Sequence, residues 1–105
     1  PLAMGLLTGK FTRDHVFADD DWRRRSPLFA KEAWEENLDT VERLRPLAKS
    51  AGCSVAQLAV SWVIAKSGIT VTLCGAKRPS QIRDTASVDE KMLAAVRQIP
   101  MSIEV

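Results

Sequence analysis

The sequence predicts a helix-rich α/β fold with one buried parallel strand, and three observations support this class. Apolar side chains recur every three or four positions from Trp34 to Leu44, which is the helical period, and a second helical pattern follows within residues 31–67. The run ITVTLC at 69–74 is β-branched and continuously apolar, as in a strand buried on both faces of a parallel sheet. Helical segments follow it. Because one strand cannot make a sheet, we expect its neighbours to come from missing chain or from another copy.

Composition and charge indicate one globular domain. The chain has 105 residues, of which 46% are hydrophobic and 27% charged, and this is enough for a modest core. Fifteen lysines and arginines against 13 acidic residues give a net charge of +2, too even for a nucleic-acid surface. The apolar stretches are interrupted and too short to span a bilayer, so we expect neither nucleic acid nor a membrane as a partner.

The two cysteines, Cys53 and Cys74, show no spacing typical of metal ligands, so we expect no metal site. We expect reduced thiols and a cytoplasmic location, with an isolated disulfide as the alternative. The chain opens on Pro1 and contains no tyrosine. A first residue other than methionine leads us to expect a processed or excised piece of a longer protein.

The amino-terminal 30 residues are predicted to be mostly loop. Residues 1–11, PLAMGLLTGKF, place Pro1, Gly5 and Gly9 among apolar residues, which suits a loop lying close to another group or the start of a short helix. Residues 12–30 mix both charges without a sustained period. We expect an irregular, exposed segment there.

From Lys31 the periodicity predicts a long amphipathic helix. Acidic residues near its start and basic residues near its end complement the helix dipole. Pro46 lies inside the pattern and should kink or divide the helix, because proline lacks the N–H that a helix needs. Gly52 is expected to end it.

A second helix is predicted to begin after Ser54 and to complete the helical segment 31–67. Ser54 and Gln57 have the spacing of a capping box. The body of this helix is apolar on nearly all sides, so we expect burial on more than one face. Gly68 is expected to end it before the strand at 69–74.

Residues 75–99 are predicted to form a loop and two terminal helices. Pro79 suits the first turn of a helix over 79–86. The last helix is expected over 89–98, and Pro100 should end it.

The turn after the predicted strand carries two adjacent cations at a position suited to an anion. Gly75 allows the backbone to approach a ligand closely, and N–H groups at the start of the next helix attract anions. Lys77 and Arg78 add full charges, and an arginine can bind a phosphate through two parallel hydrogen bonds. The alternative is that both are solvated surface cations.

A second glycine-bearing segment favours the phosphate interpretation. PLAMGLLTGK also offers glycines, backbone amides and a lysine, and it too precedes a helix. In eight-stranded α/β barrels, phosphate sites are frequently built from the loops after strands seven and eight. Residues 1–11 and 75–78 are consistent with such a pair.

Four segments together resemble the aldo-keto reductase family. PLAMGLLTGKF, DDDWRRRSPLF, NLDTVERLRPLAKSAGCSVAQLAVSWVIAK and TLCGAKRPSQIRDT follow the order and spacing of the carboxyl-terminal part of its bacterial and plant members, over residues 1 to about 87. The resemblance implies a partial (β/α)8 (TIM) barrel, the portion after strand seven, with 69–74 as strand eight. It also implies NADP(H) as the cofactor and, in the intact enzyme, carbonyl reduction by hydride transfer.

The resemblance assigns a set of residues to the cofactor. The backbone of the first loop would face the pyrophosphate, with Lys10 reaching the phosphates. The second loop would wrap the adenosine end, with Lys77 and Arg78 on the ribose 2′-phosphate. Gln81 and Asp84 match positions that contact the adenine-side ribose and base. The implied cofactor-binding residues are Leu2, Ala3, Gly5, Leu7, Thr8, Gly9, Lys10, Gly75, Ala76, Lys77, Arg78, Gln81 and Asp84.

The chain departs from the family's pattern in several places. Thr85 stands where the family usually has asparagine and Cys74 where it has proline, and the last helix arrives early. The family's catalytic aspartate, tyrosine, lysine and histidine lie in an amino-terminal half that this chain lacks, and His15 does not match the catalytic histidine. We therefore assign no catalytic residue. We expect the chain alone to be inactive, because no proton donor is in place.

Three other interpretations stay open. SAGCSVAQLAVSW has the spacing of a helix-turn-helix, although only Gln57 and Ser61 could read base edges. DDDWRRR is either a solvated loop or a loop whose Arg23 or Arg24 closes over the cofactor. A third interpretation is a self-associating half barrel, an interaction module or evolutionary remnant whose exposed sheet edge is covered by homo-oligomerisation. The chain could also be one half of an enzyme that a complementing amino-terminal half completes.

Overall fold

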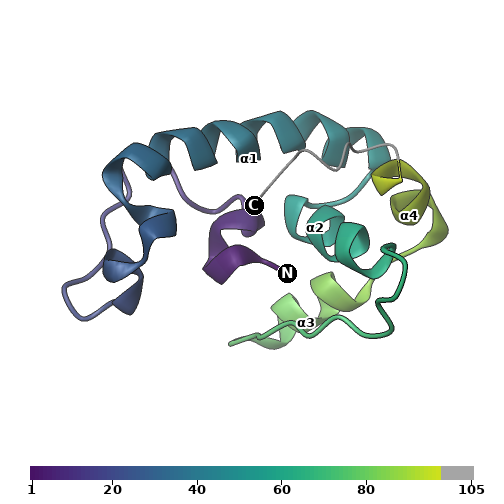
Figure 1. Ribbon diagram of the computed structural model, residues 1–105. Coiled ribbons are helices and arrows are strands. Elements are labelled where there is room, and N and C mark those ends of the chain that lie inside the picture. Colours follow the sequence, from purple (N-terminus) through teal and green to yellow (C-terminus); the bar gives the residue numbers. More distant parts are fainter. Residues whose placement is uncertain (98–105) are drawn as a thin grey trace.

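The computed structural model describes residues 1–97, and in that range the chain forms four α-helices and three short 3-10 helices (Figure 1). The long helix α1 crosses one side of the molecule and meets α2 at a bend of 85°. Helix α2 is the central element, because it packs against α1, α3, α4 and η1. The bounds are η1 Ala3–Thr8, η2 Trp22–Arg25, η3 Pro27–Phe29, α1 Lys31–Ala51, α2 Val55–Ile64, α3 Pro79–Ala86 and α4 Glu90–Val96.

Helix α1 forms where the periodicity predicts it and ends at the predicted residue. Gly52 has a φ of 70°, and its N–H donates to the carbonyls of Ala48 and Lys49. The prediction that Pro46 divides the helix is wrong, because α1 runs through this residue without a break. Pro46 is exposed, so water can satisfy the carbonyl one turn earlier that loses its N–H partner.

The capping box of α2 is confirmed. The Ser54 Oγ accepts a hydrogen bond from the Gln57 N–H at 3.0 Å, and the Gln57 Oε1 accepts one from the Ser54 N–H at 3.0 Å. The helix is buried on more than one face, as expected. Its end differs from the prediction: it stops at Ile64, and a turn closed by the Ile69 N–H on the Lys66 carbonyl precedes the extended segment. The buried residues of α2 are Val55, Ala56, Leu58, Val60 and Ser61.

The core lies between α1 and α2 and is closed by η1, η3 and α4. Leu58 and Val41 from the two long helices are almost fully buried, as are Leu6 of η1 and Val96 of α4. This packing extends into the segment 12–30, which was expected to be irregular and exposed throughout. That segment contains η2 and η3, and an aromatic cluster joins it to α1 through Phe11, His15, Phe17, Phe29 and Trp34.

The predicted buried parallel strand at 69–74 is not formed. These residues are neither helix nor strand, and their apolar side chains face solvent: Ile69 is 42% exposed, Val71 67% and Leu73 81%. A strand is held by hydrogen bonds to a neighbouring strand, and no part of residues 1–97 supplies one. The sequence of this segment is that of a strand, but the pairing partner is not in the described structure.

The two terminal helices form as predicted, with small shifts at their ends. Pro79 occupies the first turn of α3. Asp89 caps α4, and its carboxylate accepts from the Met92 N–H at 2.9 Å. The expected stop at Pro100 lies outside the described residues. Within residues 1–97 no single helix is long and apolar enough to cross a membrane, and α1 with α2 reaches that length and composition only across the 85° bend.

Candidate functional site

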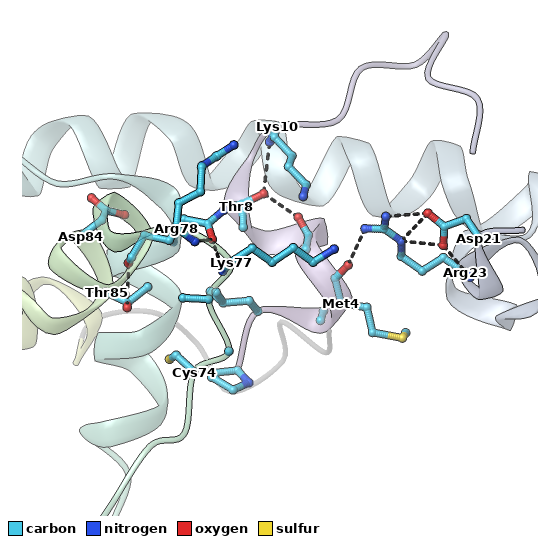
Figure 2. Close-up of a pocket in the computed structure, with 18 of the residues that line it drawn as sticks. Met4, Thr8, Lys10, Asp21, Arg23, Cys74, Lys77, Arg78, Asp84 and Thr85 are labelled. Carbon is cyan, nitrogen blue, oxygen red and sulfur yellow. Dashed lines mark hydrogen bonds and ion pairs between the residues drawn. The ribbon is translucent and has the colours of Figure 1, made fainter. Parts of the chain in front are cut away.

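One cavity of about 1030 Å3 opens between the amino-terminal segment, the residues just before and within η2, the start of α2 and the loop that leads into α3 (Figure 2). Its volume is at the upper end of the range for small-molecule sites. Eleven of the thirteen residues predicted to bind the cofactor line it. They are Leu2, Ala3, Gly5, Thr8, Lys10, Gly75, Ala76, Lys77, Arg78, Gln81 and Asp84.

The first wall is a turn with strained backbone. Ala3 and Met4 have φ values of 48° and 58°, in the left-handed region that residues with a side chain rarely adopt. Gly5 follows with a φ of 97°, and a Cβ there would lie 3.3 Å from Lys10 Cε. The Thr8 hydroxyl closes the turn by donating to the Gly5 carbonyl at 2.6 Å. Strain of this kind is concentrated at ligand-binding sites, which makes this turn a candidate for one.

Leu7 and Gly9, the other two predicted residues, do not line the cavity. The Leu7 side chain is buried in the core. Gly9 has a φ of 74°, and its carbonyl accepts a hydrogen bond of 2.8 Å from Arg45 Nη2. Both residues therefore anchor the turn to the rest of the molecule rather than facing the cavity.

The second wall is the loop between Cys74 and α3. The Gln81 side chain holds it, because its Oε1 accepts from the N–H groups of Lys77 at 2.7 Å and Arg78 at 3.2 Å. These two amides are thus occupied by the protein itself. The side chains of Lys77 and Arg78 are exposed and remain the part of this loop that can meet an anion.

Four cations surround the cavity. Figure 2 shows the side chains of Lys10, Lys77 and Arg78 in the same region, with Arg23 at one edge. Burial lowers the pKa of the Lys10 ammonium, and the charges of Arg23, Lys77 and Arg78 lower it further. A site that disfavours its own lysine's charge in this way favours an anion, since an anion relieves the repulsion.

The carboxylate of Asp21 faces this cationic group. Its Oδ2 lies 2.6 Å from Arg23 Nη2, and hydrogen bonds from the Arg23 side chain and backbone lower the pKa of Asp21 from 3.8 to about 2. Asp20 and Asp84 also line the cavity, so three carboxylates stand against four cationic side chains there. The cavity keeps a positive excess.

Of the two arginines considered for the cofactor, Arg23 and not Arg24 lies at the cavity. Arg23 lines the cavity, donates to the Met4 carbonyl at 3.3 Å, and lies over the rings of Phe11 at 5.5 Å and Phe17 at 4.9 Å. Arg24 instead pairs with Asp19. Arg23 thus connects the segment 12–30 to the turn of η1. Nothing in the run DDDWRRR indicates which of its arginines makes this contact.

Other lining residues were missed by sequence reasoning. Ser54 and Ala56 reach the cavity from the start of α2, and the Ser54 hydroxyl donates to Asp84 Oδ2 at 3.1 Å. Thr85, whose identity departs from the family pattern, also lines the cavity. The only signal for Ser54 was its capping role, which says nothing about a site. The remaining lining residues are Pro1, Met4, Ala18, Asp20, Asp21, Trp22 and Cys74.

Chemically, the cationic lining of the cavity is suited to binding an anion. Its charged donors are lysines and arginines, which hold an anion by charge-assisted hydrogen bonds. Cys53 and Cys74 are free thiols. His15 is exposed and stacks on Phe11 and Phe17 outside this cavity.

Comparison with known proteins gives a consistent result. The family model described as "Aldo/keto reductase family" matches residues 1–98. The aldo-keto reductase YhdN of Bacillus subtilis is 40% identical over 88 residues, which cover 83% of this chain and 27% of that protein. The NADH-specific methylglyoxal reductase of Escherichia coli is 33% identical over 87 residues, which cover 83% of this chain and 26% of that protein.

A solved structure agrees with the sequence relatives. The glycerol dehydrogenase AKR11B4 of Gluconobacter oxydans superposes with a TM-score of 0.73 at 35% identity, over 98% of this chain and 34% of that one. The chain spans about a quarter of the length of the two curated relatives named above. Because the family model matches nearly the whole sequence, the chain belongs to the aldo/keto reductase family.

Proposed function

We propose that this chain is the cofactor-binding, carboxyl-terminal portion of an NADP(H)-dependent aldo-keto reductase, a part of a (β/α)8 barrel. The observation that carries the proposal is the cavity in which two glycine-bearing segments bring Lys10, Lys77 and Arg78 together, with Arg23 of η2 beside them. In the intact enzyme the cofactor would supply the hydride that reduces a carbonyl group. The residues of this chain would bind and orient that cofactor.

The two walls divide the cofactor between them. Lys10 and the backbone of the η1 turn would hold the pyrophosphate, and Arg23 lies beside them. Lys77 and Arg78 would hold the ribose 2′-phosphate, since their side chains are exposed at the other wall. Gln81 and Asp84, whose carboxylate accepts from the Ser54 hydroxyl, would contact the adenine-side ribose and base.

The sharpest test is whether the chain prefers NADPH, which carries the 2′-phosphate, over NADH. This preference does not follow from family membership, because one relative is named NADH-specific. Calorimetric titration of the chain should give tighter binding of NADPH than of NADH. The variant Lys77→Ala with Arg78→Ala should lose about tenfold or more in NADPH affinity and leave NADH affinity unchanged, as charge-assisted bonds are lost. Arg83→Ala is the matched control, because Arg83 lies on α3 and does not line the cavity. Equal affinity of the unmodified chain for both cofactors would contradict the proposal.

Catalysis is expected to need residues from elsewhere. The sequence contains no tyrosine, and we assign no catalytic role to any of its residues. A positioned proton donor contributes about 10²–10⁴-fold to such a reaction. The purified chain should therefore show no carbonyl-dependent oxidation of NADPH, and turnover above the uncatalysed rate would overturn this expectation.

A second candidate function rests on the exposed apolar segment 69–74. Ile69, Val71 and Leu73 expose a row of apolar side chains that have the character of a strand without a partner. We propose that a second copy of the chain or a complementing amino-terminal half covers this segment. The chain would then act as a self-associating half-barrel module, or as one half of a divided enzyme. The free thiols of Cys53 and Cys74 support a reducing, cytoplasmic setting for either role.

A further inference from the structure

The backbone between Gly9 and Arg13 is tied to helix α1 at both of its ends. At one end Arg45 Nη2 donates to the Gly9 carbonyl at 2.8 Å. At the other end Trp34 Nε1 donates to the Arg13 carbonyl at 3.3 Å, and the Arg13 guanidinium pairs with Glu35 and Asp39. The segment is therefore fixed on α1 by side chains that α1 presents about three turns apart.

Lys10 lies between these two contacts with α1, and its side chain points away from α1 into the cavity. The next residue, Phe11, is buried in the core, so the backbone of this segment cannot swing freely. The Lys10 side chain projects into the cavity among Arg23, Lys77 and Arg78. Arg23, Lys77 and Arg78 repel the Lys10 ammonium, so its place in the cavity depends on how firmly its backbone is held.

The Arg45 side chain is itself held in place. Its Nε donates to Glu42 Oε1 at 2.8 Å, one turn earlier on α1. A Cβ added at Gly9 would lie 3.1 Å from Arg45 Nη1, so the guanidinium packs closely on the turn that precedes Lys10. A carbonyl that accepts from a guanidinium fixed by a carboxylate has little freedom to move.

We propose that Arg45 is a positioning residue for Lys10: by holding the Gly9 carbonyl on α1, it keeps the Lys10 ammonium in the cation-lined cavity. Arg45 does not line that cavity, so its effect on a ligand passes through Lys10. This inference rests on the proposed function, because Lys10 must contact the phosphates of a bound ligand for Arg45 to influence binding.

The test is a double-mutant cycle with NADPH as the probe. Arg45→Met removes the donors but keeps an apolar stem, and it should weaken NADPH binding about fivefold, the loss expected from about one net hydrogen bond. Lys10→Met should weaken binding at least as much. Adding Arg45→Met to Lys10→Met should cause no further loss, because the residue through which Arg45 acts has been removed. Arg45→Lys should restore part of the affinity, since an ammonium can still donate to the Gly9 carbonyl.

The matched control is Arg43→Met, because Arg43 lies on the same helix, donates to Thr40 Oγ1 at 3.2 Å and does not line the cavity. It should bind NADPH as the unmodified chain does. If Arg45→Met weakens binding equally with and without Lys10, Arg45 supports the fold generally and the inference is wrong. If Lys10→Met weakens binding but Arg45→Met does not, the inference fails while the proposed function stands. If Lys10→Met has no effect on NADPH binding, the proposed role of Lys10 is wrong, and the inference about Arg45 is wrong with it.

A second measurement needs no ligand. Amide hydrogen exchange at residues 9–11 should become faster in Arg45→Met and stay unchanged in Arg43→Met, because only the first variant releases the turn from α1. Unchanged exchange in Arg45→Met would overturn the inference whatever the binding experiments show.

Discussion

The hydroxyl of Ser54 donates a hydrogen bond of 3.1 Å to the carboxylate of Asp84, and this bond joins the beginning of α2 to α3. A second bond runs beside it, from Gln57 Nε2 to the Asp84 carbonyl at 2.8 Å. Helix α3 has no buried residue of its own. Polar bonds at the start of α2 therefore hold in place the helix that carries one wall of the cavity.

Replacing Ser54 should test this connection. Ser54→Ala removes the cap of α2 and the bond to Asp84, and we expect a loss of about 1 kcal/mol in the free energy of unfolding, the usual cost of a lost cap. Urea denaturation measures it. Ser50→Ala is the control, because Ser50 is an exposed residue of α1 and alanine favours a helix. Equal stability of the two variants would show that the Ser54 bonds contribute little.

The pair of Asp21 and Arg23 should make the cavity sensitive to acid. The pKa of Asp21 is lowered from 3.8 to about 2, so the folded state favours the charged carboxylate. The stability that this pair contributes is fully present above pH 3.8 and is lost as the pH falls towards 2. NMR titration of the Asp21 carboxyl should give the lowered pKa. In Arg23→Met the pKa should return towards 3.8, and a value that stays near 2 would point to another cause.

Two glycines of the cavity segments should respond differently to a methyl group. Gly9→Ala forces a φ of 74° on alanine and pushes against Arg45, so we expect a loss of about 1–2 kcal/mol in the free energy of unfolding. Gly75→Ala meets no atom within 4 Å and should leave stability nearly unchanged. Thermal denaturation compares the two. A Gly75 variant as unstable as the Gly9 variant would contradict the geometry described for both.

The exposed apolar row should drive association. We expect light scattering to give a mass above that of one chain, because Val71 and Leu73 lie uncovered. Val71→Asp with Leu73→Asp should lower the measured mass. Thr70→Asp is the control, since Thr70 lies in the same exposed segment but adds no apolar surface. A monomer of the unmodified chain at high concentration would rule out this route to a partner.

Local rules predicted most of the helical structure. The ends of α1 and the start of α2 depend on residues that act on their own neighbours, such as Gly52 and Ser54, and a sequence displays these directly. The strand at 69–74 could not be predicted in the same way, because a strand exists only with a partner. Pro46 shows the converse: its identity predicts a break, but it is exposed and α1 continues through it.

The residues of the cavity also divide into those that the sequence could indicate and those that only the folded structure reveals. Glycines and cations in the sequence pointed to the two loops, and the family resemblance named the thirteen residues of which eleven line the cavity. Asp21 and Ser54 reach the cavity only through tertiary packing, which no spacing reveals. Leu7 and Gly9 were placed in the site by the family resemblance, but Leu7 packs in the core and the Gly9 carbonyl is bonded to Arg45 of α1.

The two walls of the cavity come from opposite parts of the chain, since Gly5 and Gly75 are 70 positions apart in the sequence. A molecule that contacts both walls would hold these distant segments together while it is bound. Because it would bind only the folded chain, a free concentration of 100 times its dissociation constant would add about 2.7 kcal/mol to the free energy of unfolding. The same molecule would slow the escape of α3 from the body of the protein, and resistance of the chain to proteolysis would then report its occupancy.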